Sequence, residues 1–211
     1  MADWVTISAL ATAGGTLVLA GATFSSVRSA NRAARVAERS LLLGLRPVLV
    51  PSRPEDPPER VTFVDHYFSV DGGTAHVEEL EGRLYFAFPL RNVGAGLAVL
   101  HSWEIRARDV SLRDEHGDPE RFRAIQRDLY VAAGDTGYWQ GALRDADDPR
   151  HGEIRSAIEA GRPLLVEVLY GDHEGGQRTI SRFGISPGED GGGWSCNVLR
   201  HWQLEGIDPR H

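Results

Sequence analysis

The chain has 211 residues and a formal net charge of −7, which leaves room for one medium-sized domain and an additional segment. All of its basic residues are arginines, so a Schiff-base lysine, a phosphate-loop lysine and a Ser-x-x-Lys nucleophile are excluded. The single cysteine, Cys196, excludes an intramolecular disulfide and any zinc site that needs several cysteines.

Negative charge is concentrated after the first 46 residues, which hold five arginines and only two acidic residues. An acidic domain repels a phosphate backbone, so we expect no nucleic-acid partner. The charge serves the solubility of the domain instead.

The chain begins with an uncharged run of 24 residues, from Trp4 to Val27. At 1.5 Å per residue this run is long enough to cross a hydrocarbon core of roughly 30 Å, so residues 4–27 are predicted to be a single transmembrane helix in the lipid bilayer. A cleaved signal peptide is one alternative, but the chain starts Met1-Ala2-Asp3 rather than with the basic residues of such a peptide. A helix buried in the domain is the other.

The charges on either side of this run indicate its orientation. Asp3 precedes it, and five arginines follow it: Arg28, Arg32, Arg35, Arg39 and Arg46. Because positive residues flank spans on the cytoplasmic side, we expect an inner (plasma) membrane location with the N-terminus outside and the C-terminal domain in the cytoplasm.

The helical pattern continues past the uncharged run, and one helix is predicted from about residue 3 to 44, within a first unit of residues 1–46. The five arginines lie in a sector about 60° wide on a helical wheel, opposite alanines and leucines. Four of them are therefore candidates to contact anionic lipid headgroups: Arg28, Arg32, Arg35 and Arg39. The alternative is a solvated arginine stripe, with the Ala/Leu face packed on the domain or on a second copy.

Self-association of this helix is a further prediction. Small residues recur at four-residue spacing, at Ser8, Thr12, Thr16 and Ala20. Small residues at that spacing let two helix backbones approach closely, which favours a homo-oligomer.

The soluble part starts with a proline-rich connector, residues 47–60, that includes a short first strand. Over residues 61–211 the hydrophobic period becomes alternating, as in strands. Strands are predicted at 61–64, 67–70, 83–90, 97–110, 163–170, 177–183 and 194–203, and a short helix at 152–160. Residues 129–131 and 138–140 flank Gly134-Asp135-Thr136-Gly137 and are predicted to pair as a hairpin, as are 163–170 and 177–183.

Short strands at these intervals predict a fold that is mainly β with a long N-terminal α-helix. The expected domain at 61–211 is an antiparallel β-sandwich of immunoglobulin-like architecture, and a partly open barrel is the alternative. The Cys-Trp-Cys signature of true immunoglobulin domains is absent, so only the architecture is predicted.

Three short segments carry a family resemblance: Leu41-Leu42-Leu43-Gly44-Leu45-Arg46-Pro47, Leu90-Arg91-Asn92-Val93-Gly94-Ala95-Gly96-Leu97-Ala98 and Tyr170-Gly171-Asp172. Together with the N-terminal run, the chain resembles uncharacterised membrane-anchored proteins common in actinobacteria. The resemblance covers most of the chain. It implies an N-terminal transmembrane helix followed by a β-sandwich-like domain, and it implies no activity.

The sequence contains no recognisable constellation of catalytic or ligand-binding residues. The histidines of the soluble region have neither the His-x-x-x-His spacing nor the clustering of a metal site. Gly94-Ala95-Gly96 lacks the third glycine and the following helix of a dinucleotide-binding loop. We therefore predict no catalytic, cofactor-binding or metal-binding residues and no cofactor.

These observations favour a membrane-tethered, cytoplasmic binding or scaffolding module that holds an unknown protein partner and is not an enzyme. An enzyme is the alternative, with a site assembled from scattered histidines and carboxylates such as His101, His173 and Glu167. A structural subunit of an envelope assembly is a variant of the first hypothesis.

Overall fold

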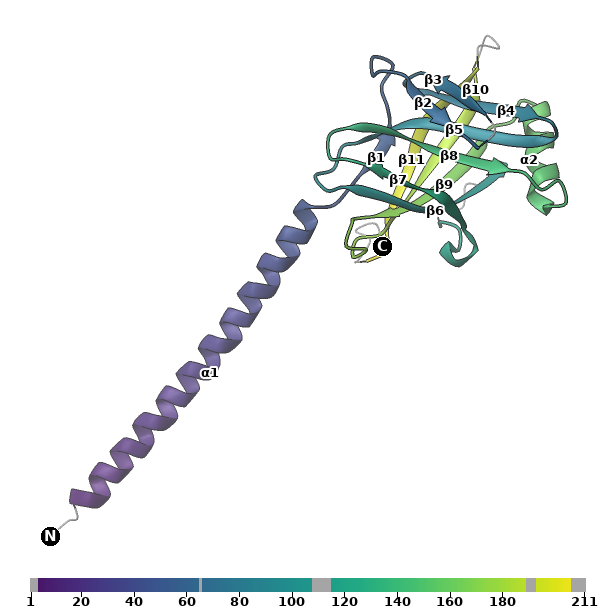
Figure 1. Ribbon diagram of the computed structural model, residues 1–211. Coiled ribbons are helices and arrows are strands. Elements are labelled where there is room, and N and C mark those ends of the chain that lie inside the picture. Colours follow the sequence, from purple (N-terminus) through teal and green to yellow (C-terminus); the bar gives the residue numbers. More distant parts are fainter. Residues whose placement is uncertain (1–3, 65, 108–114, 189–192, 206–211) are drawn as a thin grey trace. The chain divides into compact units, whose positions relative to one another are not determined.

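A computed structural model describes residues 4–64, 66–107, 115–188 and 193–205 of the chain. The chain divides into two compact units, Met1–Gly44 and Leu45–His211. The first unit contains a single continuous helix, α1 (Trp4–Gly44) (Figure 1). Its alanine-rich sequence has no proline, so nothing interrupts the backbone hydrogen bonds. The helix predicted from about residue 3 to 44 is confirmed.

No helix among the described residues is both long enough and apolar enough to cross a membrane. The transmembrane span predicted for residues 4–27 is therefore not supported. The run contains many glycine, serine and threonine residues, which are less apolar than leucine or valine.

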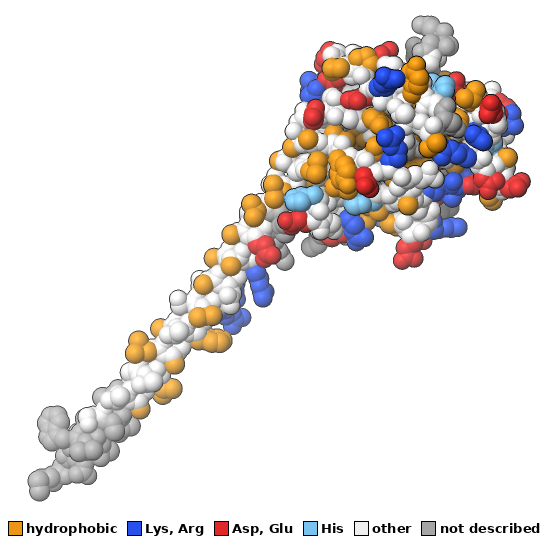
Figure 2. Space-filling model, in the orientation of Figure 1, with side chains coloured by type: hydrophobic (Ala, Val, Ile, Leu, Met, Phe, Trp, Pro, Cys, Tyr) orange, Lys and Arg blue, Asp and Glu red, His pale blue; other side chains and the backbone are white. Residues whose placement is uncertain are grey.

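The described side chains of α1 are all exposed. Leu17, Val18 and Leu19 are consecutive and are exposed at 74 %, 72 % and 69 %. Because consecutive helical residues point roughly 100° apart, apolar surface surrounds the helix here rather than forming one stripe. Figure 2 shows apolar side chains along much of α1 and basic ones on its C-terminal part. Arg28, Arg32 and Arg35 are exposed, and the Arg39 side chain lies outside the described residues.

The second unit is mainly β, and every strand pair in it is antiparallel. Its elements are β1 (Leu49–Pro51), β2 (Glu59–Thr62), β3 (Tyr67–Val70), β4 (Thr74–Leu80), β5 (Arg83–Asn92), β6 (Ala98–Ala107), a 3-10 turn η1 (Pro119–Arg121), β7 (Arg123–Val131), β8 (Thr136–Leu143), α2 (Pro149–Glu159), β9 (Leu164–Gly171), β10 (Thr179–Pro187) and β11 (Trp194–Gln203). One nine-stranded sheet has the order β1-β5-β4-β11-β10-β9-β6-β7, with β8 paired to β5, and β2 and β3 form a separate hairpin.

The nine-stranded sheet curls so that its two arms face each other across one core (Figure 1). Phe88 of β5 packs against Trp139 of β8 and Phe183 of β10, with ring centroids 4.8 and 4.9 Å apart. The prediction of a mainly β, antiparallel fold behind a helix is confirmed. The immunoglobulin-like sandwich is not confirmed, because β4 and β11 join the two arms into one continuous sheet.

The β2–β3 hairpin covers the outer face of β5 and β8. Val61 and Phe63 are buried against Tyr85 and Ala87 of β5, and the rings of Phe63 and Tyr85 lie 5.0 Å apart. Because the hairpin covers this face, β5 is buried along almost its whole length. In a strand with one solvent-exposed face, buried and exposed side chains would alternate.

The segment that follows α1 is held by the loop after β5, which we call the Asn92 clamp (Asn92–Gly96). The Asn92 side chain is fully buried and accepts from the backbone N–H groups of Val48 and Gly94. Its amide group donates to the carbonyl oxygens of Gly96 and Val131. A Cβ on Gly96 would lie 1.6 Å from the Leu45 carbonyl oxygen, so only glycine lets the two backbones approach this closely.

Candidate binding site

The sheet has an opening between β7 and β8. These two strands are consecutive in the chain, but the strand register joins β7 to β6 and β8 to β5, and among the described residues no pair joins β7 to β8. The hairpin pairing predicted for residues 129–131 and 138–140 is therefore wrong. The turn between them instead bonds to β5, through Gly134 N–H to the Asn92 carbonyl and Asn92 N–H to the Asp135 carbonyl.

β7 also bulges away from β6 at the same place. Leu129 pairs with Leu100 and Ala124 pairs with Ser102, so β7 has four residues between these pairs where β6 has only His101. The residues from Ile125 to Asp128 consequently have no partner on β6. A bulge of this size leaves the backbone of one strand outside the ladder.

A pocket of about 390 Å³ lies at this opening. It is bounded by β7, β8 and the end of the β2–β3 hairpin, and it includes Phe63 and Val64 from that hairpin. Three arginines line it, Arg123 and Arg127 on β7 and Arg144 just after β8, and no aspartate or glutamate lines it. We call it the arginine pocket. It is a local basic site on an otherwise acidic domain.

Each of the three guanidinium groups is held in place by a neighbour. Arg123 forms an ion pair with Asp148, and its guanidinium lies 5.9 Å from the centre of the Trp103 ring. Arg127 donates to the Thr62 carbonyl at 2.8 Å, and Arg144 donates to the Gln126 side chain at 3.2 Å. Burial, together with the nearby charge of Arg150, lowers the pKa of Arg123, but an arginine remains protonated in proteins.

Two polar atoms of pocket residues are buried without a hydrogen-bond partner among the described residues: Arg123 Nε and Gln140 Oε1. A buried donor or acceptor without a partner costs about 1–3 kcal/mol. Both atoms are closed off from solvent, so a ligand in the pocket reaches them only if these side chains turn. What the pocket itself offers a ligand is the charge of its three arginines.

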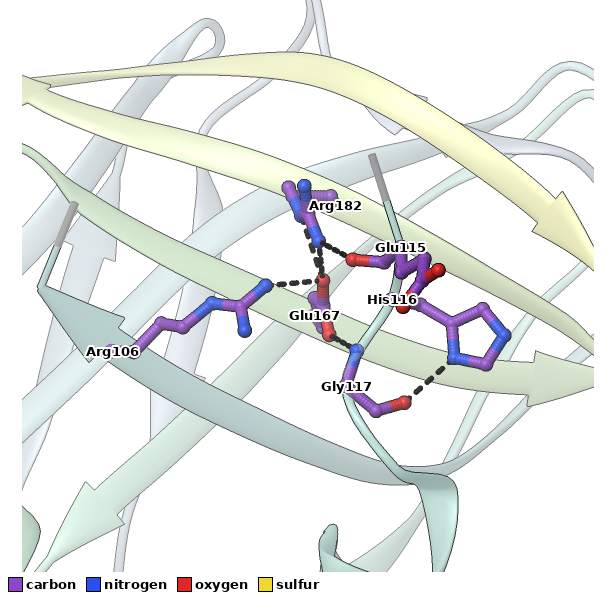
Figure 3. A network of polar contacts seen from close by, with 6 residues as sticks. All are labelled: Arg106, Glu115, His116, Gly117, Glu167 and Arg182. Carbon is purple, nitrogen blue, oxygen red and sulfur yellow. Dashed lines mark hydrogen bonds and ion pairs between the residues drawn. The ribbon is translucent and has the colours of Figure 1, made fainter. Parts of the chain in front are cut away.

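A second polar cluster centres on Glu167, which is only 1 % exposed (Figure 3). Its carboxylate accepts from Arg182 Nε at 2.7 Å, from Arg106 at 2.9 Å and from the Gly117 N–H at 2.7 Å. Arg182 also donates to the Glu115 carbonyl and lies 4.6 Å from the centre of the Trp202 ring. This cluster fixes the segment at 115–117 onto β9 and β10, so we assign it a structural role.

A serine–histidine pair with a fully buried serine lies between β10 and β11, and no sequence motif indicates it. Ser181 Oγ is 2.6 Å from His201 Nδ1 and 2.9 Å from the Tyr170 hydroxyl, which also accepts from Leu49 N–H. Ser181 and Tyr170 are fully buried, and burial raises the pKa of the Tyr170 phenol. A serine enclosed in this way cannot reach a substrate, so the chain of hydrogen bonds is part of the core.

His66, His76 and Glu78 lie together, and both imidazoles approach one carboxylate oxygen of Glu78, at 3.3 and 3.2 Å. No set of three or more histidine, cysteine and acidic residues within the described parts of the chain meets the geometry for holding a metal ion. The ring of His76 instead stacks on Phe68, with centroids 3.7 Å apart. We therefore interpret this group as fastening the β2–β3 hairpin to β4.

The residues of the enzyme hypothesis do not meet in the arginine pocket. The Glu167 carboxylate is occupied by hydrogen bonds from Arg106 and Arg182. His101 is an exposed residue at the bulge of β6. His173 is exposed beside Glu174 on the turn after β9. None of the three lines the arginine pocket. No protein-family model matches this chain, and no match was found among curated proteins.

Proposed function

We propose that the β domain is a binding module and that the arginine pocket binds an anionic group of its ligand. The observation that carries the proposal is a pocket lined by Arg123, Arg127 and Arg144 and by no carboxylate. Guanidinium groups form bidentate, charge-assisted hydrogen bonds to planar anions, and these are among the stronger polar contacts in proteins. The pocket volume lies within the range of ligand sites, roughly 300–1,000 Å³.

We propose in addition that α1 tethers this module to a membrane, with the domain on the cytoplasmic side. This second part rests on exposed apolar side chains rather than on overall hydropathy. Leu17, Val18 and Leu19 surround the helix with apolar surface that water disfavours. The hydroxyls of Thr12 and Thr16 donate to carbonyl oxygens one turn earlier, at 2.9 and 2.8 Å, which lowers the cost of placing them in an apolar medium.

The arginines that follow suit the edge of such a membrane. Arg28, Arg32 and Arg35 are exposed within the two turns after the apolar part of α1. Each basic residue near an anionic leaflet contributes about 1 kcal/mol of binding free energy. Their position after the run is also what favours a cytoplasmic domain.

The binding function is tested by titrating the full chain with three probes at low ionic strength: inorganic phosphate, citrate and a short glutamate-rich peptide. At least one probe should bind saturably, as measured by calorimetry. Substituting Arg127 and Arg144 together by glutamine should lower the affinity for that probe by at least tenfold, because charged hydrogen bonds contribute about 1.5–3 kcal/mol each.

Arg162→Gln is the matched control, since this exposed arginine follows α2 and does not line the pocket. It should bind the probe as the unsubstituted chain does. The proposal fails if none of the three probes binds, or if the double variant binds as tightly as the control.

A further inference from the structure

We infer that the ligand of the arginine pocket is an extended acidic peptide segment of a protein partner, which adds as a strand along the free edge of β8. This inference rests on the proposed function of the arginine pocket and names the chemistry of its ligand. The inference follows from the parts of β7 and β8 that line the pocket.

The pocket is lined by the edges of strands rather than by their faces. Its lining includes every residue of β7 from Arg123 to Arg127 and the consecutive residues of β8 from Gln140 to Ala142. Successive side chains of a strand point to opposite faces, so a cavity over one face would be lined by every second residue only. A cavity lined by consecutive residues faces the backbone itself.

Both edges are outside the sheet ladder at this point. β8 pairs through one edge with β5, from Leu143 to Thr136, and the register gives its other edge no partner among the described residues. β7 leaves its ladder with β6 between Ile125 and Asp128. A strand edge with open N–H and C=O groups is a template for an added strand.

The side chains around these edges select the sequence of the added strand. Arg127 and Arg144 lie at the pocket with no carboxylate in its lining, so acidic side chains are favoured over basic or neutral ones. Alternate side chains of an extended peptide share one face at a spacing of roughly 7 Å, so one acidic residue in two can meet the arginines. The apolar Phe63 and Val64 can pack against the intervening residues.

A small anion would satisfy this site only in part. Phosphate or citrate can accept from the guanidinium groups that line the pocket. Neither brings the row of N–H donors that the open carbonyls of a strand edge require. A peptide carries carboxylates and N–H donors together, and it is the ligand that meets both needs.

The test compares an acetylated and amidated hexapeptide of alternating glutamate and threonine with the same peptide N-methylated at its three threonines. N-methylation keeps the charge and removes the N–H donors of one edge. A third peptide, N-methylated at the three glutamates, blocks the other edge. We expect the full chain to bind the unmodified peptide and one of the two methylated peptides, and to lose at least about tenfold in affinity for the other.

The Arg127→Gln/Arg144→Gln double variant should no longer bind the unmodified peptide measurably, and the Arg162→Gln control should bind it as the unsubstituted chain does. Equal affinity for all three peptides, or binding of phosphate or citrate without the peptide, overturns strand addition and leaves the proposed binding function intact. Binding of no probe at all overturns both. Slowed amide exchange from Gln140 to Arg144 on adding the peptide would locate the new strand on β8.

Discussion

At the scale of single residues, Asp56 shows how one ion pair fastens the connector to the sheet. Its carboxylate is bound by the guanidinium of Arg91 on β5 and by the backbone N–H of Arg53 at 2.8 Å. The hydrogen bonds from Arg91, and then that from Arg53, lower the pKa of Asp56 below its ordinary value of 3.8. The folded protein therefore holds this proton more weakly than the unfolded chain does.

The sign of the resulting pH dependence follows directly. A lowered folded-state pKa means that the ion pair stabilises the fold above the unfolded pKa of about 4, and that this contribution is lost as the pH falls through the folded value. We expect Asp56→Asn to destabilise the protein at neutral pH and to make its stability less sensitive to acid. Denaturant unfolding at several pH values between 7 and 2 measures both effects.

Asp147→Asn is the control for this prediction, because it removes one negative charge at an exposed position of the loop before α2. This variant should show the same loss of unfolding free energy at acid pH as the unsubstituted protein. An Asp56→Asn variant with the same loss at acid pH as the unsubstituted protein would contradict the assignment.

At the scale of structural elements, the glycines of the domain are not equivalent. Gly96 lies in the Asn92 clamp, where a Cβ would meet the Leu45 carbonyl oxygen at 1.6 Å. Gly152 lies within α2, where a Cβ would meet nothing within 4 Å. The same substitution should therefore change the free energy of unfolding in opposite directions at the two positions.

We expect Gly96→Ala to destabilise the domain by more than about 1 kcal/mol, because the clamp must open to admit the methyl group. Gly152→Ala should stabilise it by about 0.5–1 kcal/mol, since alanine loses less backbone entropy than glycine in a helix. Thermal unfolding of the two variants beside the unsubstituted chain measures the difference. A neutral Gly96→Ala would show that the clamp does not hold the connector.

Most elements could be predicted from local pattern, and their pairing could not. Alternating bulky residues predict β5, β9 and β10, and the β9–β10 hairpin is confirmed. β4 was missed because Thr74–Leu80 is polar, with a single buried position at Ala75. The pairing of β8 with β5 was missed because it joins residues about fifty positions apart, and turn residues report only on neighbours.

The arginine pocket was invisible in the sequence for a related reason. Arg123, Arg127 and Arg144 come from two strands whose proximity depends on the curl of the whole sheet. The net negative charge of the domain also concealed a basic site, because composition averages over the surface. The four-residue spacing of Arg123 and Arg127 places both side chains on one face of a strand, but no strand was predicted at these residues.

At the scale of the whole molecule, α1 and the domain form separate compact units, so their roles can be separated. We expect the full chain to sediment with vesicles of phosphatidylglycerol and phosphatidylcholine, and residues 45–211 alone to remain in the supernatant. The apolar side chains of α1 and its arginines would supply the affinity.

High salt separates the two contributions to this binding, because salt screens the arginines and leaves apolar burial intact. Retention of the full chain on vesicles in 1 M salt indicates insertion of α1, and release indicates a surface contact through Arg28, Arg32 and Arg35. A full chain that stays in the supernatant at low salt would refute the membrane tether.

The Asn92 clamp gives the domain a mechanical property. A pull that arrives along the chain at Leu45 meets three hydrogen bonds between the connector and the clamp, and then the β1–β5 ladder. They run from Ala95 N–H to Arg46 O, from Val48 N–H to Asn92 Oδ1 and from Val93 N–H to Val48 O. Bonds loaded together must break together, whereas bonds loaded in sequence unzip one by one. The junction is therefore suited to carry tension from Leu45 into the sheet.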